Sequence, residues 1–325
     1  MKEVVEYNKY RFTNVDEFLK SISYGGELFN LFAYGFFFRG HSKQEYKLIP
    51  SSLRKEPFFK FLSFDNLSED ESILRDKEFI QIYQEYELLL QFYEGCDETS
   101  LKMPFIDDIN FEYHIDKKAI FPHFSEWIPQ SMYGLAALAQ HHRVPTRLLD
   151  WTRDITTAIY FALSDYLNGM VPDYSNHFEI WALDAKLVED LGKDFPLRII
   201  KPPYSENPNL SAQKGVFTLW KVSYDTLFPK ELQKDDKSIV VENDIEIDRR
   251  PLDEILISYF KNNPNLCKGT YLYRIVFPID IPRLYKYITK MKANAKYLFP
   301  GYDGVRREMK ERAVVEKIYR VTGKV

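Results

Sequence analysis

The sequence Gln-His-His-Arg-Val-Pro-Thr-Arg-Leu-Leu-Asp-Trp-Thr, at residues 140–152, carries the densest structural information in this chain. Pro145 forces Val144 out of the helical region of backbone conformation, so no regular helix can continue through the middle of the stretch. A helix is predicted before it, from residue 131 to about residue 140. The stretch therefore separates this helix from the structure that follows.

A second helix is predicted directly after this stretch, with Asp154 or Thr152 as its N-cap. Its apolar residues recur at the spacing of one face of a helix. They are Ile155, Ala158, Ile159, Ala162 and Leu163. We therefore predict a buried helix at this point of the chain.

Another informative stretch, Gly-Phe-Phe-Phe-Arg-Gly-His-Ser, occupies residues 35–42. Residues 34–39 form a short apolar run that ends at Gly40, a pattern typical of a buried strand followed by a turn. The two stretches place Arg39 and Arg147 beside apolar residues that favour burial. Because arginine keeps its charge in proteins, each needs an anion or several carbonyl oxygens nearby. Two such arginines indicate a site.

The remaining pattern predicts an α+β fold. Further helices are predicted at residues 14–31, from a capping box at residues 68–71 to about residue 93, and at residues 250–263 and 281–292. Strands are predicted at residues 178–183, 216–222, 238–246 and 271–277, and residues 314–321 could close the sheet. Residues 96–126 and 201–210 are predicted to be loops. Helices are thus expected mainly in the N-terminal half and strands in the C-terminal half.

The composition of the 325 residues, with 45% hydrophobic and 28% charged residues, suits a globular protein. No repeat or flexible linker interrupts the chain, so we expect one domain over residues 1–325. Its core motifs would lie at residues 30–165, and a strand-rich part at residues 175–325 would complete the same fold. The formal net charge of −4 lacks the basic field of a nucleic-acid-binding protein, although it leaves room for a local basic cleft.

The number of cysteines and the lengths of the apolar runs indicate in which cellular compartment the protein is expected. Cys96 and Cys267 are the only cysteines, which provides neither a disulfide framework nor a zinc cluster. The first residues lack the apolar run of a signal peptide, and no run is long enough to cross a bilayer. We therefore expect a cytoplasmic protein without a membrane partner. No metal site is predicted, because no set of His, Asp and Glu has ligand spacing.

Several of these stretches resemble the FRG domain family, which takes its name from the tripeptide Phe38-Arg39-Gly40. The long stretch at residues 140–152 is the most specific match, and residues 48–54 and 158–162 are also similar to the family. Weaker similarities occur at residues 212–217 and 298–304. FRG-like proteins are encountered among bacterial systems of antiphage defence and toxin-like systems, which is an association rather than an activity.

The FRG family is in turn distantly similar to the ADP-ribosyltransferase superfamily. There an early strand ends in Arg or His, often followed by Gly, and Arg39 and Gly40 match this element. Thr152, ahead of an Ala-rich and Phe-containing helix, resembles the second element. The third element usually carries Glu, whereas this chain has Gln213 near the expected place. The resemblance implies an ADP-ribosyltransferase-like mixed-sheet core, with NAD as a candidate substrate.

Cleavage of the glycosidic bond of NAD passes through an oxocarbenium-like state, which a nearby carboxylate stabilises. Arg39 could bind a phosphate through its planar guanidinium, and Gly40 would let a ligand approach the backbone closely. Gln213 can bond to a ribose hydroxyl but cannot offset positive charge, so Asp150 is the best acid within a motif. The catalytic candidates are Arg39, His141, Asp150, Thr152 and Gln213. The ligand-binding candidates are Arg39, Gly40, Arg147 and Tyr160, the last as a ring that could stack on the ligand.

Structural roles compete with these chemical ones. Arg39 could simply tie loops together through carbonyl oxygens, and Gly40 is more often a turn glycine. Arg147 and Asp150 are three residues apart and could form an internal salt bridge. Thr152 is more often a helix cap than a catalytic hydroxyl.

Three functions therefore stay open. The first is an enzyme of ADP-ribosyltransferase type that binds or consumes NAD. The second is a non-catalytic module that binds a phosphorylated ligand, a nucleotide or a protein partner, which the glutamine at position 213 favours. The third is a hydrolase that uses His141 or His142 as a base with Asp150. Adjacent histidines point in different directions on any regular element, so one of the two is expected to be structural.

Overall fold

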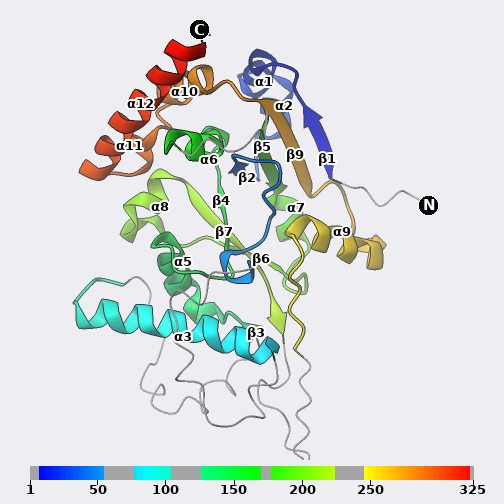
Figure 1. The fold of residues 1–325 in the computed structure, drawn as a ribbon. Helices are drawn as coiled ribbons and strands as arrows, with labels where there is room; N and C mark the ends of the chain where they lie inside the picture. Colours follow the sequence, from blue (N-terminus) through cyan, green and yellow to red (C-terminus); the bar gives the residue numbers. More distant parts are fainter. Residues whose placement is uncertain (1–6, 55–76, 104–125, 170–176, 224–244, 323–325) are drawn as a thin grey trace, which may run out of the picture.

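The computed structural model describes residues 7–54, 77–103, 126–169, 177–223 and 245–322 (Figure 1). Within these ranges the fold is a mixed α+β structure built around one seven-stranded sheet. In the described part of the chain, no helix is both long enough and apolar enough to cross a membrane.

The large sheet has the strand order β1-β9-β5-β2-β4-β7-β6. These strands are, in that order, Asn8–Arg11, Leu272–Pro278, His177–Asp184, Phe36–His41, Leu149–Thr152, Gly215–Trp220 and Leu197–Ile200. β1 and β9 run parallel, and the other neighbouring pairs are antiparallel. A separate pair of short strands joins β3 (Glu126–Trp127) to β8 (Val222–Ser223).

Most of the strand predictions are confirmed. The runs at residues 178–183, 216–222 and 271–277 correspond to β5, β7 with the start of β8, and β9. Of the strand predicted at residues 238–246, residues 238–244 lie outside the described residues, and residues 245 and 246 are not in a strand. The early strand predicted at residues 34–39 is β2, displaced by two residues toward the C-terminus.

Helices cover both faces of the sheet. The helices on one face are α1 (Val15–Ile22), α6 (Ile155–Leu167) and α10 (Ile281–Lys290), and those on the other are α7 (Ala185–Asp190) and α9 (Leu252–Asn262). Phe38 of β2 is buried in the first core and Phe37 in the second. Because neighbouring residues of a strand point to opposite faces, this one strand anchors both cores.

A third core lies around α3 (Lys77–Glu98) and α5 (Tyr133–His141), which pack against residues of β7. In Figure 1, α3 lies at the end of the molecule opposite α11 (Ala295–Leu298) and α12 (Tyr302–Thr322). The helix predicted to end near residue 140 is confirmed as α5. The helix predicted to run to about residue 93 is α3, which ends five residues later; its predicted capping box lies outside the described residues.

α6 is the helix predicted after residue 152, and Asp154 is its cap. The Asp154 Oδ1 atom accepts a hydrogen bond of 2.8 Å from the backbone N–H of Thr156. α6 packs directly on β2 at Gly40, where an added Cβ would lie 1.9 Å from the carbonyl oxygen of Ala158. Gly40 therefore lies inside a strand under a helix, and its predicted place in a turn is wrong.

One helix prediction and one strand prediction need correction. Residues 14–31 form two helices, α1 and α2 (Glu27–Leu31), because Gly25 adopts a positive φ of 79° between them. Residues 314–321 belong to α12 and do not extend the sheet. Their partly buried Val315 and Ile318 contact the core three residues apart, so helical packing overrides the strand preference of β-branched residues.

The expected concentration of helices in the N-terminal half is also wrong. α7, α9, α10 and α12 all lie in the second half, together with α8 (Pro208–Ala212), which falls within a predicted loop. The predicted loop at residues 96–126 begins inside α3, and its residues 104–125 lie outside the described residues. Strands and helices are thus interspersed along the chain around a single mixed sheet.

Candidate functional site

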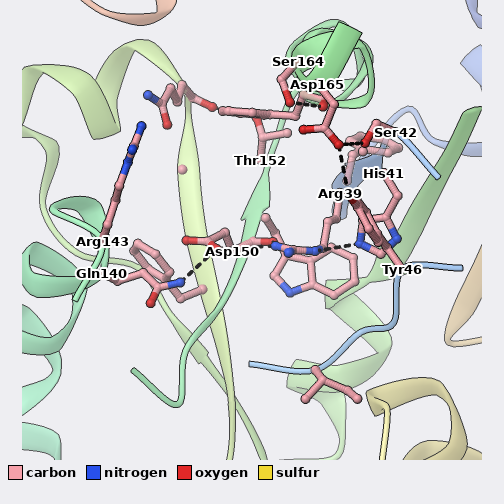
Figure 2. Close-up of a pocket in the computed structure, with 18 of the residues that line it drawn as sticks. Arg39, His41, Ser42, Tyr46, Gln140, Arg143, Asp150, Thr152, Ser164 and Asp165 are labelled. Atoms are coloured by element: carbon pink, nitrogen blue, oxygen red, sulfur yellow. Dashed lines mark hydrogen bonds and ion pairs between the residues drawn. The ribbon is translucent and has the colours of Figure 1, made fainter. Parts of the chain in front are cut away.

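A cavity of about 1010 Å³ opens above the middle of the sheet (Figure 2). β2, β4 and β7 contribute to its floor, together with the segment from Glu45 to Arg54, the C-terminal end of α5, and one side of α6. Small-molecule pockets in proteins commonly enclose roughly 300–1,000 Å³, so this cavity has room for a ligand as large as a dinucleotide.

The side chains lining the cavity carry an excess of positive charge. Its six fixed cations are Arg39, Lys47, Arg54, Arg143, Arg249 and Arg307, against the three carboxylates Glu45, Asp150 and Asp165. The formal net charge of the whole chain is −4, so positive charge is concentrated here against the overall balance. A cleft with charge of one sign focuses its field and attracts ions of the opposite sign.

Arg39 points from the middle of β2 into the cavity, with 16% of its side chain exposed. Its Nη1 atom donates a 2.8 Å hydrogen bond to the backbone oxygen of Asp150 and lies 3.4 Å from the Asp150 Oδ2 atom. Burial lowers the pKa of Arg39, although a guanidinium stays charged over the physiological range. Its Nη2 atom has no hydrogen-bond partner among the described residues and is available to a ligand.

His41 holds the other edge of Arg39. The Arg39 Nε atom donates a 3.0 Å hydrogen bond to the His41 Nε2 atom, so the histidine proton resides on Nδ1. That Nδ1 atom faces the Oε1 atom of Glu179 at 3.7 Å. Both His41 and Glu179 are buried, and Arg274 pairs with the Glu179 Oε2 atom at 2.6 Å. Burial lowers the pKa of His41, which keeps the ring neutral and able to accept from Arg39.

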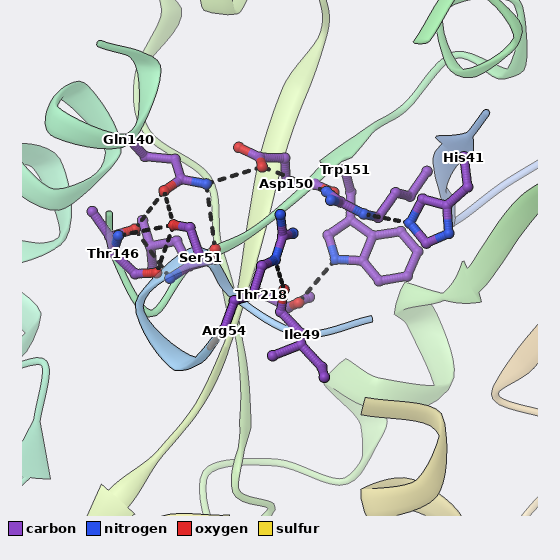
Figure 3. Close-up of polar contacts among 11 residues, drawn as sticks. His41, Ile49, Ser51, Arg54, Gln140, Thr146, Asp150, Trp151 and Thr218 are labelled. Atoms are coloured by element: carbon purple, nitrogen blue, oxygen red, sulfur yellow. Dashed lines mark hydrogen bonds and ion pairs between the residues drawn. The ribbon is translucent and has the colours of Figure 1, made fainter. Parts of the chain in front are cut away.

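Asp150 is held in place by Gln140, a residue that the sequence did not single out (Figure 3). The Gln140 Nε2 atom donates a 3.0 Å hydrogen bond to Asp150 Oδ2. Its Oε1 atom accepts a 2.8 Å bond from the Thr146 hydroxyl and lies 3.2 Å from the hydroxyl of Ser51. About half of the Asp150 side chain is exposed. Gln140 thus joins two stretches of sequence and presents a carboxylate to the cavity beside Arg39.

The segments that contain Arg39, Ser51, Gln140 and Asp150 all lie in a region of the chain that matches a protein-family model. Residues 35–169 match the model of the FRG domain. The chain carries an FRG domain. No curated protein and no solved structure matches the chain significantly. The FRG resemblance is therefore confirmed, whereas the likeness to ADP-ribosyltransferases stays a prediction.

The matched region supplies only part of the cavity. Gln213, Arg249, Phe299 and Arg307 line it from outside residues 35–169. In the sheet, β2 and β4 of the FRG domain are flanked by β5 and β7, which come later in the chain. The site is thus assembled by the FRG domain together with the C-terminal half.

The predicted salt bridge between Arg147 and Asp150 is wrong. Arg147 instead forms a bidentate ion pair with Glu85 of α3, with two N–O distances of 2.9 Å. Arg147 lies at a bend before β4 and turns inward toward α3, whereas Asp150 lies in β4 and lines the cavity. Glu85 also accepts bonds from Trp127 and Ser52. Both partners of the pair are almost fully buried, so Arg147 is not placed among the lining residues and its predicted role in ligand binding has no support.

Thr152 and Gln213 both line the cavity, but their polar groups are largely engaged within the protein. The Thr152 hydroxyl donates a 2.7 Å bond to the backbone oxygen of Gln213 and accepts one from the backbone N–H of Asp154. The Gln213 amide donates a 3.2 Å bond to the backbone oxygen of Leu298. These contacts tie β4 to the segment after α8 and to α11.

Tyr160 is fully buried and is not among the lining residues. Its hydroxyl donates a 2.7 Å bond to Glu311 of α12, so the predicted stacking of its ring on a ligand is not supported. Burial raises the pKa of Tyr160. Phe161 and Phe299 present their rings to the cavity instead, and the Arg307 guanidinium lies 4.5 Å from the centre of the Phe299 ring.

His141 and His142 point in different directions, as predicted. His141 lines the cavity at the C-terminal end of α5, and burial lowers its pKa, which favours the neutral base. His142 instead packs against Phe92 of α3, with ring centres 6.1 Å apart. Only His141 therefore keeps a place among the catalytic candidates.

Two further parts of the site were missed at the sequence level. Arg143, directly after α5, is exposed in the cavity with a left-handed φ of 67° and no polar partner among the described residues. Asp165 of α6 accepts bonds from the hydroxyls of Ser42 and Tyr46. Neither residue carries a local signal, because Arg143 follows the helix directly and Asp165 lies within the predicted helix. Among the described residues, no three His, Cys, Asp or Glu side chains are grouped to hold a metal ion.

Proposed function

We propose that this FRG-domain protein binds a phosphorylated ligand of nucleotide size in the large cavity, with NAD as the ligand to test first. The observation that carries the proposal is the set of six fixed cations around a cavity of about 1010 Å³ in an acidic chain. Phosphate groups are recognised by arginine through charge-assisted, frequently bidentate hydrogen bonds. Arg39 and Arg143 are the residues best placed to provide them.

The cations of the cavity differ in how rigidly they are held. Arg39 is fixed on two sides by His41 and Asp150, so a ligand would meet a preorganised guanidinium. Arg54 donates from Nε to the backbone oxygen of Ile49 and leaves its terminal nitrogens free among the described residues. Preorganised donors lose less entropy on binding, which favours Arg39 as the anchor of the phosphate.

NAD cleavage of ADP-ribosyltransferase or glycohydrolase type is the chemistry we propose for a catalytic form of the site. The bond between C1′ of the ribose and the nicotinamide nitrogen would break, with its electron pair leaving on nicotinamide. Asp150 would stabilise the positive charge that develops on the ribose. Water or an acceptor hydroxyl would then attack C1′ and give its proton to His141, which is neutral because burial lowers its pKa.

A non-catalytic binding function is the second candidate. It is favoured by the engagement of Thr152 and Gln213, the two residues at the second and third positions of the ADP-ribosyltransferase pattern. If their polar groups serve the fold, the cavity would bind its ligand without turning it over. Release of free nicotinamide from NAD separates the two candidates.

Titration calorimetry with NAD, ADP-ribose and ATP tests the proposal. We expect binding that weakens at least roughly tenfold in Arg39→Ala and in Arg143→Ala, because a hydrogen bond to a charged group contributes about 1.5–3 kcal/mol. Arg143→Ala removes no side-chain hydrogen bond or ion pair among the described residues, so its effect on binding reports mainly on the ligand. Arg320→Ala, which removes an exposed cation at the far end of α12, serves as the control. No binding of any of the three ligands at millimolar concentration would refute the proposal.

A further inference from the structure

Asp165 is a cavity carboxylate that the proposed phosphate binding does not use. It lies on α6, and its Oδ2 atom accepts hydrogen bonds from the Ser42 hydroxyl and, at 3.0 Å, from the Tyr46 hydroxyl. Its Oδ1 atom has no hydrogen-bond partner among the described residues. Because both neighbouring hydroxyl protons are directed at one oxygen, the other keeps its lone pairs for a donor that arrives from the cavity.

The cavity side chains beside Asp165 on α6 and after β2 are polar and uncharged, although Lys43 lies over the Tyr46 ring at 6.0 Å. Ser42, Tyr46, Ser164 and Asn168 line the cavity beside it. The Ser164 hydroxyl donates to the backbone oxygen of Phe161 at 2.8 Å, so its oxygen can only accept from a ligand. This end of the cavity therefore offers the Asp165 carboxylate and the Ser164 oxygen as acceptors to the donor groups of a ligand.

The two ends of the cavity differ in the charge they present. Figure 2 shows Asp165 and Ser42 on one side and Arg143 on the other, with Thr152 and Asp150 between them. A ligand that satisfies both ends must carry an anionic group at one end and neutral hydrogen-bond donors at the other. A ribose has this character, because its vicinal hydroxyls donate to a carboxylate while the adjoining phosphate binds arginine.

We infer that Asp165 forms a ribose subsite and selects ligands with intact hydroxyls. This inference rests on the proposed function, since it assigns ribose binding to the Asp165 end of the cavity in which the phosphate is proposed to bind. Ser42 and Tyr46 act as positioning residues that fix the Asp165 carboxylate. The substrate class is thereby narrowed from phosphorylated compounds to ribonucleotides.

The test compares ADP with 2′,3′-dideoxy-ADP by titration calorimetry on the full chain. For the unaltered protein we expect ADP to bind at least roughly tenfold more tightly, as a hydrogen bond to a carboxylate implies. In Asp165→Asn that ratio should fall to about twofold or less, because the charged acceptor is lost. Asp190→Asn changes the same charge on the exposed surface of α7 and should keep the full ratio.

Tyr46→Phe provides a second variant, because Tyr46 is exposed and the change removes only the hydroxyl that bonds Asp165. It should lower the ADP to dideoxy-ADP ratio in the same direction, by roughly threefold, without removing the carboxylate. An unchanged ratio in both Asp165→Asn and Tyr46→Phe, with ADP still bound in an Arg143-dependent way, would overturn the ribose subsite alone. Failure of the unaltered protein to bind either nucleotide would overturn the proposed function together with the subsite.

Discussion

His41 determines how Arg39 can be presented to a ligand. Its neutral ring accepts a hydrogen bond from Arg39 Nε through Nε2, while its Nδ1 atom faces Glu179. This bond fixes the Nε side of the guanidinium. Protonation would turn Nε2 into a donor and place a second cation beside Arg39. Burial, opposed by the bond to Glu179 and assisted by the charges of Arg39 and Arg54, lowers the pKa of His41.

This arrangement makes the stability of the protein depend on pH. Because the His41 pKa in the folded state lies below its ordinary value of 6.5, the contribution of the neutral ring is fully present above about pH 6.5. It is lost as the pH falls through the lower, folded-state pKa, since the unfolded chain takes up the proton more readily. We expect thermal unfolding measured from pH 7.5 to pH 5 to show a shallower loss of stability in His41→Gln than in the unaltered protein.

The control for this experiment is Gln130→Ala, which removes an exposed side chain that does not ionise. Its pH dependence should match that of the unaltered protein. Equal slopes in His41→Gln and the unaltered protein would show that His41 does not couple protonation to folding.

At the scale of elements, the contact of α6 with β2 depends on the absence of a side chain at position 40. An alanine Cβ would lie 1.9 Å from the Ala158 carbonyl oxygen, and that backbone atom cannot move without moving the helix. Overpacking of this kind costs roughly 1–3 kcal/mol and occasionally more. α6 carries Asp165 and β2 carries Arg39, so both elements of this contact line the cavity.

We therefore expect Gly40→Ala to lower the free energy of unfolding by at least about 2 kcal/mol, measured by denaturant titration. Gly95→Ala is the matched control, because Gly95 lies in α3 with open space around it. Alanine is the better helix former by up to about 1 kcal/mol, so this control should be neutral or stabilising. A Gly40→Ala protein as stable as the Gly95→Ala control would contradict the close helix–strand contact.

At the scale of the whole molecule, the FRG domain and the C-terminal half share one sheet. β5 and β7 flank the strands of the matched region, and Glu311 of α12 accepts from the buried Tyr160 of α6. Arg307, on the same face of α12, donates to Glu311 at 3.0 Å and reaches the cavity. The single domain expected over residues 1–325 stays a prediction, and from this sharing we propose that the chain folds as one unit.

The isolated fragment of residues 35–169 tests whether the chain folds as one unit. Without β5 and β7, the central strands lose their sheet partners and expose the apolar faces that contain Phe37 and Phe38. We expect the isolated fragment to show no cooperative thermal transition by circular dichroism, whereas the full chain should unfold in a single one. A cooperative fragment with a native-like melting temperature would show that the FRG domain folds independently.

Elements of the fold could be predicted from the sequence where the residues that determine them are neighbours in the chain. α5 ends at His141 shortly before Pro145, Asp154 caps α6, and the apolar face of α6 follows from residue spacing alone, so these elements were predicted correctly. Residues 314–321 were predicted wrongly as a strand because their β-branched residues favour that state locally, while helical packing against the core decided otherwise.

The sequence by itself determined that an FRG domain is present, and it predicted a site from the two stretches at residues 35–42 and 140–152. Only the tertiary structure decided which charges meet. Arg147 pairs with Glu85, 62 residues away, and Ser42 with Asp165, 123 residues away. The physical reason is that a charged or polar side chain is satisfied by whichever partner the chain topology brings within about 3 Å. Local patterns record that a partner is needed, but the fold selects it.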